Sequence, residues 1–147
     1  MKDPSKDAQR WFRQSEDDYR FVKWLKKEGD FFDKGCFMAQ QAGEKALKAC
    51  LYGIGKRRVI GHSLYEMVDQ LSKEEPQFKQ IFSESKRLDR YYIPTRYPNG
   101  IPGGIPYQVY DKEDFDNAFE DLKLIIELCR RFLEDQAILS SSKKSES

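Results

Sequence analysis

The stretch GCFMAQQAGEKALKACLYG, residues Gly35–Gly53, carries small and apolar side chains at three- and four-residue spacing. They are Cys36, Ala39, Gly43, Ala46, Leu47, Cys50 and Leu51. This spacing places them on one face of a helix that continues for about four turns. Its Ala and Gly residues let other helices approach the backbone closely, and Gly53 and Gly55 end it. The stretch therefore predicts a central helix on which the rest of the chain packs.

Four further helices are expected around this one. Apolar periodicity predicts a first helix from Lys6 to Glu28, and its short link to the central helix predicts an antiparallel hairpin. Ser63, with Glu66 three residues later, is a capping pattern for a third helix. Pro76 suits the first turn of a fourth helix, and Asp111 caps a long last one. We expect one all-α domain over residues 6–138, a bundle of five helices, followed by a disordered polar tail over residues 139–147.

The segment Ile93–Tyr110, IPTRYPNGIPGGIPYQVY, fits no helix because it holds four Pro and three Gly. Pro-Asn-Gly and Pro-Gly-Gly are turn signals. A long connection without secondary structure inside a compact domain is more often functional than incidental. Its aromatic side chains and Pro-fixed backbone predict an ordered loop, packed on the helices just before the last one.

Composition excludes several classes of protein. The net charge of the 147 residues is +1, so no chain-wide cationic field for DNA or a membrane surface is expected. No apolar run approaches the roughly 20 residues that span a bilayer. The three cysteines, Cys36, Cys50 and Cys129, lie in helical patterns without a CxxC spacing, and the chain has a single His. We therefore expect buried, reduced thiols in a cytoplasmic protein and no metal site.

His62 is the first candidate for chemistry. With Arg57 it makes an Arg-x4-His spacing that resembles a signature of certain metal-independent ribonucleases, in which His is the acid or base and Arg holds the phosphate. The structural alternative is that His62 packs or forms hydrogen bonds at the start of the third helix.

Basic side chains are the second candidate. Lys45 and Lys48 lie on the central helix, the basic segment 56–58 lies on the loop after it, and Lys86, Arg87 and Arg90 lie on the fourth helix. They either converge on a phosphate or form an ordinary solvated surface. Arg96, between prolines and aromatic residues, either faces a ligand or pairs with an acid such as Asp89 to hold the loop.

Four segments together resemble one known family. They are AQRWFRQ (8–14), CFMAQQAGEKALK (36–48), GHSL (61–64) and LDRYYIPTRYP (88–98). These strings, in order over about residues 8–135, are similar to the HEPN domain (higher eukaryotes and prokaryotes nucleotide-binding), either of the standalone prokaryotic type or of the type at the C-terminus of sacsin, a chaperone-related protein. The resemblance implies a five-helix up-and-down bundle that forms a homodimer. It also implies GTP or ATP as a ligand, and a nucleotidyltransferase or chaperone-related partner.

The resemblance also implies candidate contacts for the nucleotide: Lys45, Lys48, His62, Arg96 and Tyr97. In ribonucleolytic members of the family the Arg-x4-6-His signature lies near the position of Arg96, yet no His follows Arg96 in this chain. The Arg57-x4-His62 spacing thus falls on a different segment, which weakens the prediction of a ribonuclease.

The expected function is a nucleotide-binding, homodimeric module with no catalytic residue and no cofactor, so we do not expect an enzyme. Two alternatives stay open. One is a HEPN ribonuclease toxin of a toxin–antitoxin pair, and the other is a scaffold that binds proteins without a nucleotide.

Overall fold

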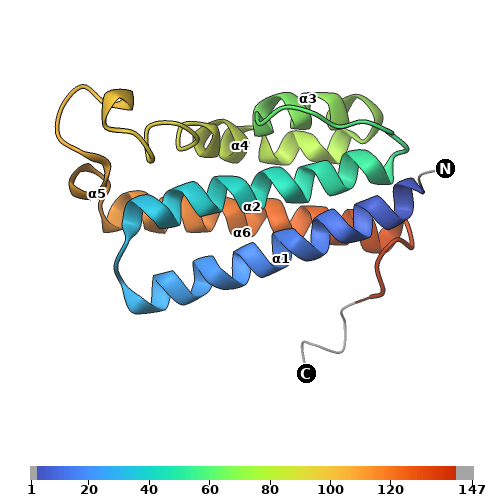
Figure 1. Ribbon diagram of the computed structural model, residues 1–147. Coiled ribbons are helices and arrows are strands. Elements are labelled where there is room, and N and C mark those ends of the chain that lie inside the picture. The colour runs from blue at the N-terminus through green and yellow to red at the C-terminus, as the bar shows by residue number, and fades with distance from the viewer. Residues whose placement is uncertain (1–2, 142–147) are drawn as a thin grey trace.

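Three long helices lie side by side in the computed structural model, which describes residues 3–141 (Figure 1). They are α1 (Pro4–Glu28), α2 (Phe32–Gly53) and α6 (Lys112–Asp135). The shorter helices are α3 (Leu64–Glu74), α4 (Phe82–Asp89) and α5 (Pro106–Val109), and 3₁₀ turns occupy Pro76–Ile81 and Pro98–Gly100. No strand occurs between residues 3 and 141, and the predicted all-α bundle is confirmed.

The first two helices form the predicted hairpin. Gly29 ends α1 in the left-handed conformation, with φ 72°, and its N–H donates to the carbonyl oxygen of Leu25. Only glycine adopts this conformation without steric cost, so the chain reverses here within a few residues. At the other end of α1, the Asp3 carboxylate accepts a hydrogen bond from the Ser5 N–H, and Pro4 occupies the first helical position.

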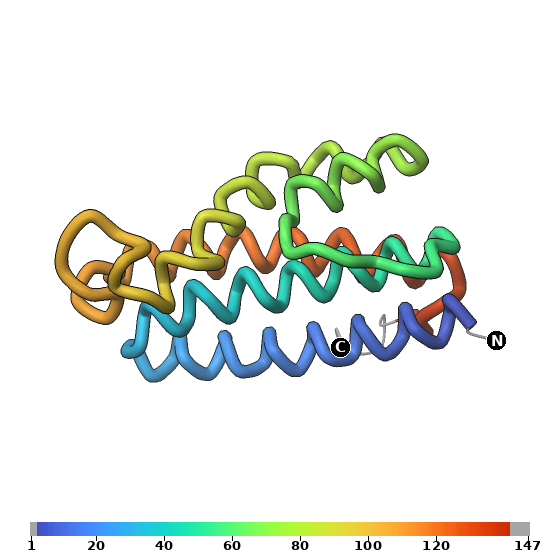
Figure 2. Tube along the Cα trace, turned by 45° about the horizontal axis from the view of Figure 1, so that its top comes forward, coloured from blue at the N-terminus to red at the C-terminus, as the bar shows by residue number. Residues whose placement is uncertain are grey.

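Helix α2 is the centre of the bundle, as its sequence predicts. It contacts α1, α3, α4, α5 and α6. Its glycines make this possible, since a Cβ atom on Gly43 would lie 2.8 Å from a methyl carbon of Leu64 in α3. The same atom would lie 3.3 Å from a methyl carbon of Leu88 in α4. Figure 2 shows the consequence: α3 and α4 run along one edge of α2, and α1 along the other.

The predicted caps are present. Ser63 Oγ accepts a hydrogen bond from the Glu66 N–H at 3.1 Å and so caps α3. Asp111 and Asp114 bond to each other's backbone N–H groups at 3.0 Å at the start of α6. Acidic caps of this kind satisfy helix N–H donors and suit the positive end of the helix dipole.

The segment after Pro76 differs from the expected fourth helix. Pro76–Ile81 is a 3₁₀ turn, and the α-helix begins only at Phe82. Ile81 leaves the helical region, with φ −116° and ψ 21°, which separates the two pieces. Phe78 and Ile81 are nevertheless buried, so the apolar pattern predicted the packing correctly even where the helix type was wrong.

The Pro/Gly-rich segment lies at the end of the bundle where α1 turns into α2, in both views (Figures 1 and 2). It is held by local bonds, including one of 2.6 Å from the Thr95 hydroxyl to the Tyr91 carbonyl oxygen. Thr95 and Pro106 are buried. The single turn of α5 lies inside this segment.

All three cysteines are buried free thiols, as expected. Burial, with smaller contributions from nearby carboxylates, raises the pKa of the Cys36 thiol. Leu139, at the start of the predicted polar tail, packs against the core, and residues 142–147 lie outside the described part of the chain. Within that part no helix is both long and apolar enough to cross a membrane.

The substitution Gly35→Ala tests the close packing of α2. The new Cβ atom would lie 2.5 Å from the buried Phe115 ring, so the free energy of unfolding should fall by about 1–3 kcal/mol. The higher helix propensity of Ala, up to about 1 kcal/mol, offsets only part of this loss. Gly103→Ala is the control, because nothing lies within 4 Å of its Cβ position. Urea unfolding measures both, and equal stabilities of the two variants would contradict the prediction.

Candidate functional site

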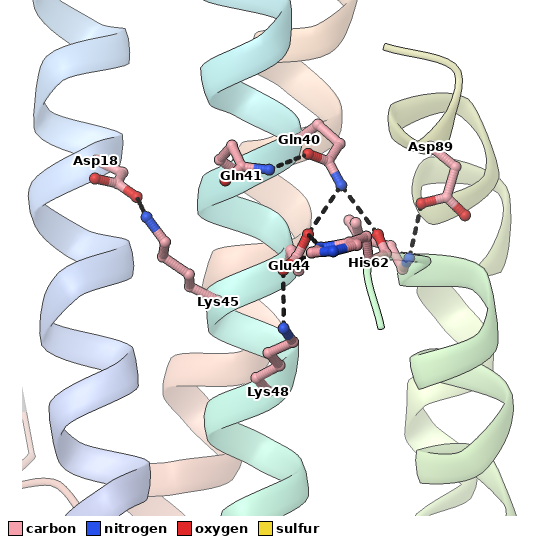
Figure 3. A network of polar contacts seen from close by, with 9 residues as sticks. Asp18, Gln40, Gln41, Glu44, Lys45, Lys48, His62 and Asp89 are labelled. Carbon is pink, nitrogen blue, oxygen red and sulfur yellow. Dashed lines mark hydrogen bonds and ion pairs between the residues drawn. The ribbon is translucent and has the colours of Figure 1, made fainter. Parts of the chain in front are cut away.

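A buried carboxylate on α2 is the shared contact of several polar side chains in the site (Figure 3). Glu44 is 5% exposed, and its carboxylate accepts from Lys48 Nζ at 2.9 Å and from Gln40 Nε2 at 3.3 Å. His62 Nδ1 lies 3.3 Å from both carboxylate oxygens. A buried carboxylate is costly without such partners. In the tautomer whose Nδ1 donates to Glu44, the lone pair of the ring is on Nε2.

The segment that carries His62 is fixed from a second side. The Asp89 carboxylate, at the end of α4, accepts hydrogen bonds from the Leu64 N–H at 2.7 Å and the Tyr65 N–H at 3.1 Å. It also accepts from the Ser63 hydroxyl at 2.9 Å. Gln40 Nε2 donates to the His62 carbonyl oxygen at 3.0 Å. The start of α3 is thereby tied to both α2 and α4, which holds the imidazole in place.

An aromatic ring joins His62 to Arg96. The His62 and Tyr92 rings stack with centroids 4.7 Å apart at 20°. The Arg96 guanidinium carbon lies 4.7 Å from the centroids of Tyr92 and Phe37, and 5.1 Å from that of Tyr97. Arg96 Nε donates to the Tyr92 carbonyl oxygen at 2.8 Å. Arg96 is exposed and does not take Asp89 as its partner, since that carboxylate caps α3.

Beside Arg96 is a hollow that we call the loop cavity. It has a volume of about 410 Å³ and lies between α2 and the Pro/Gly-rich segment. Its lining is Asp33, Lys34, Phe37, Thr95, Arg96, Pro98, Ile105, Pro106 and Tyr107. Most of these side chains are apolar or aromatic, with cationic groups only from Lys34 and Arg96. A cavity of this size and character is typical of small-molecule sites.

The five predicted contacts fall into two places. His62 and Arg96 both contact Tyr92, Tyr97 contacts Arg96, and Lys48 is joined to His62 through Glu44. Lys45 points the other way, toward α1, and forms a 2.6 Å ion pair with Asp18 (Figure 3).

Two of the other basic side chains, Arg87 and Lys56, have acidic partners within the chain. Arg87 makes two hydrogen bonds, of 2.9 and 2.8 Å, to the Asp121 carboxylate, and these raise the pKa of its guanidinium. Lys56, after the central helix, lies 3.5 Å from Glu74. These two cations are therefore already paired with carboxylates of the same chain.

Sequence reasoning missed Glu44, Tyr92, Phe37 and Lys34. Gln40, Glu44 and Lys48 are spaced by four residues, the spacing at which helical side chains meet, and this could have indicated a polar row on α2. No signal in the sequence links that row to His62 or Tyr92. Within the described residues no group of His, Cys, Asp and Glu could hold a metal ion.

Comparisons with known proteins point to one family. A model of the HEPN domain matches residues 8–132. A relative in Methanocaldococcus jannaschii, called "Putative toxin MJ1304", is 27% identical over 139 residues, covering 89% of this chain and 91% of the relative. The crystal structure of TT1696 from Thermus thermophilus is similar with a TM-score of 0.79 and 30% identity, covering 86% of this chain and 98% of that one. That of ST0689, an archaeal HEPN homologue, gives 0.69 and 28%, covering 89% and 98%.

The substitution Asp89→Ala tests the tie between α4 and the His62 segment. It leaves the N–H groups of Leu64 and Tyr65 without their acceptor, so the free energy of unfolding should fall by about 1–3 kcal/mol. Asp69→Ala is the matched control, since Asp69 is an exposed acid on α3 whose lysine partner lies 3.7 Å away. It should change stability by no more than about 0.5 kcal/mol. Denaturant unfolding measures both variants, and a small effect at Asp89 would show that its bonds do not hold α3.

Proposed function

The chain belongs to the HEPN domain family, and from that premise we propose that it is a nucleotide-binding module with no reaction of its own. The observation that carries the proposal is Arg96, which aromatic rings hold at the mouth of the loop cavity. A fixed guanidinium next to an apolar hollow suits a ligand with one anionic end and one flat, apolar end. A nucleotide has both.

Arg96 is positioned to bind the phosphate of the nucleotide. Its Nε is occupied by the Tyr92 carbonyl oxygen, which fixes the plane of the guanidinium and leaves the η nitrogens for phosphate oxygens. Lys34 lines the same cavity, and 59% of its side chain is exposed. His62, with a side chain that is 57% exposed, stacks on Tyr92, which also contacts Arg96, and offers a further hydrogen-bonding group.

The loop cavity is suited to the base. Its walls come from Phe37, Pro98, Ile105 and Pro106, with Tyr107 at the edge. Aromatic and apolar walls take up a nucleobase by stacking, and such stacking tolerates different bases.

The proposal includes a homodimer and a further partner, a nucleotidyltransferase or a chaperone-related protein. An exposed aromatic pair on α1 supports a protein contact: the Phe21 and Trp24 rings stack with centroids 6.2 Å apart. These residues are 41% and 55% exposed. Aromatic side chains are enriched at protein interfaces.

A second candidate function is RNA cleavage, and one arrangement favours it. His62 and Arg96 come from separate segments yet both contact Tyr92, so the structure brings together the two residue types of the ribonuclease signature. Nε2 of His62, with Glu44 behind Nδ1, is the group that could accept the proton of an attacking 2′-hydroxyl, and Arg96 could stabilise the phosphate charge. The relative named as a toxin agrees with this candidate.

Nucleotide binding is tested by calorimetric titration of GTP and ATP into the purified chain. Saturable binding is expected, and Arg96→Ala should weaken it about tenfold to a hundredfold, the usual value of charged hydrogen bonds. Lys45→Ala is the comparison, because Lys45 pairs with Asp18 on the other side of α2 and should leave the affinity nearly unchanged. Absence of heat with either nucleotide, or an unchanged affinity in Arg96→Ala, would refute the proposed site.

RNA cleavage is tested separately with a labelled single-stranded RNA. If the chain is a ribonuclease, His62→Ala should lower the rate at least about a hundredfold, the usual contribution of a general base. Cleavage that persists in His62→Ala would rule out His62 as the base and indicate a contaminating nuclease. No cleavage by the unmodified chain would leave the binding module as the function.

A further inference from the structure

Phe31 has an unusual backbone conformation. It precedes α2 with φ 56° and ψ 47°, in the left-handed region, where Asn, Asp or Gly is the usual residue. Its N–H donates to the Asp30 carboxylate at 2.7 Å. The residue is 56% exposed, so burial of the ring does little to offset the cost of this conformation. A large aromatic ring kept at a strained, exposed position indicates a role outside the core.

The Phe31 ring borders a second hollow, which we call the turn cavity. It has a volume of about 300 Å³ and is lined by Asp30, Phe31, Phe32, Asp33, Lys34 and Tyr107. Three of these, Asp33, Lys34 and Tyr107, also line the loop cavity. Tyr107 is 64% exposed and stands between the two. The two cavities are therefore neighbours, with the exposed Tyr107 lining both and the exposed Phe31 lining only the turn cavity.

The charges of the two cavities differ. Asp33 and Lys34 line both cavities, and Arg96 lines only the loop cavity, where its added positive charge suits phosphate. The exposed Asp30 carboxylate lines only the turn cavity, while the shared Asp33 pairs with Lys34 at 3.0 Å. Carboxylates repel phosphate but accept hydrogen bonds from the amino and imino groups of a base. The turn cavity is thus suited to a base and the boundary at Lys34 to a phosphate.

We propose that the site takes two bases joined through phosphate, one in the loop cavity and the next in the turn cavity between Tyr107 and Phe31. Lys34 and Arg96 contact the phosphate groups that connect them. Alternating rings and cations of this kind are typical of surfaces that bind successive nucleotides. The inference rests on the proposed nucleotide site and extends it. The shared chemistry, two bases linked by phosphate, occurs in single-stranded RNA and in dinucleoside polyphosphates.

The test compares one base with two. Calorimetry is carried out with adenosine 5′-monophosphate, a 5′-phosphorylated adenine RNA dinucleotide, and diadenosine tetraphosphate. The second base should raise the affinity about 5- to 150-fold, the gain from stacking one base. A gain with the RNA dinucleotide supports the proposal with RNA as the source, and a gain with diadenosine tetraphosphate supports it with a dinucleoside polyphosphate.

The variant Phe31→Asn separates binding from folding. Asn adopts the left-handed conformation readily, so the melting temperature should stay the same or rise, while the gain from the second base should disappear. Affinity for the monophosphate should not change. Tyr65→Ala is the matched control, because it removes an exposed aromatic ring that lines neither cavity and should keep the gain.

Two results would overturn the inference and leave the nucleotide site intact. One is equal affinity for the monophosphate and both two-base ligands, and the other is a gain that survives Phe31→Asn. Absence of binding by all three ligands would overturn the nucleotide site as well.

Discussion

The structure depends on the glycines of α2, which let neighbouring helices pack close to its backbone. Five other helices contact it, and at Gly35 and Gly43 the neighbouring side chains come closer than any Cβ atom permits. A larger side chain at Gly43 would push α3 and α4 away from α2, and one at Gly35 would push against Phe115 of α6. The polar row of Gln40, Glu44 and Lys48 on the same helix would then lose His62, which reaches Glu44 only because the α3 segment lies against α2. The geometry of the candidate site therefore depends on the close packing of the core around α2.

Much of the fold follows from local signals in the sequence. The hairpin at Gly29, the caps at Ser63 and Asp111 and the buried face of α2 are consequences of residues within a few positions of each other. The 3₁₀ turn after Pro76 could not be predicted, because its apolar spacing also fits an α-helix. The left-handed backbone of Phe31 could not be predicted either, because no sequence pattern indicates this conformation at a phenylalanine.

The candidate site was less accessible to sequence reasoning because its contacts join distant segments. His62 and Arg96 were both chosen from the sequence, but Tyr92, which contacts both, was not. The sequence allows Asp89 as a partner for Arg96, yet its carboxylate binds the start of α3. A charged residue has many possible partners in a chain that is 35% charged, and only the fold selects among them.

The Pro/Gly-rich segment differs from the bundle in how it is held. Between residues 93 and 110 only Thr95 and Pro106 are buried, whereas α4 and α6 at its two ends are anchored in the core. Segments with few buried contacts open locally at a lower free-energy cost than the core around them. A ligand held by Arg96 and Tyr107 on the segment and by Lys34 on α2 would suppress that opening. Amide hydrogen exchange would then slow in this segment while the core, already protected, would change little.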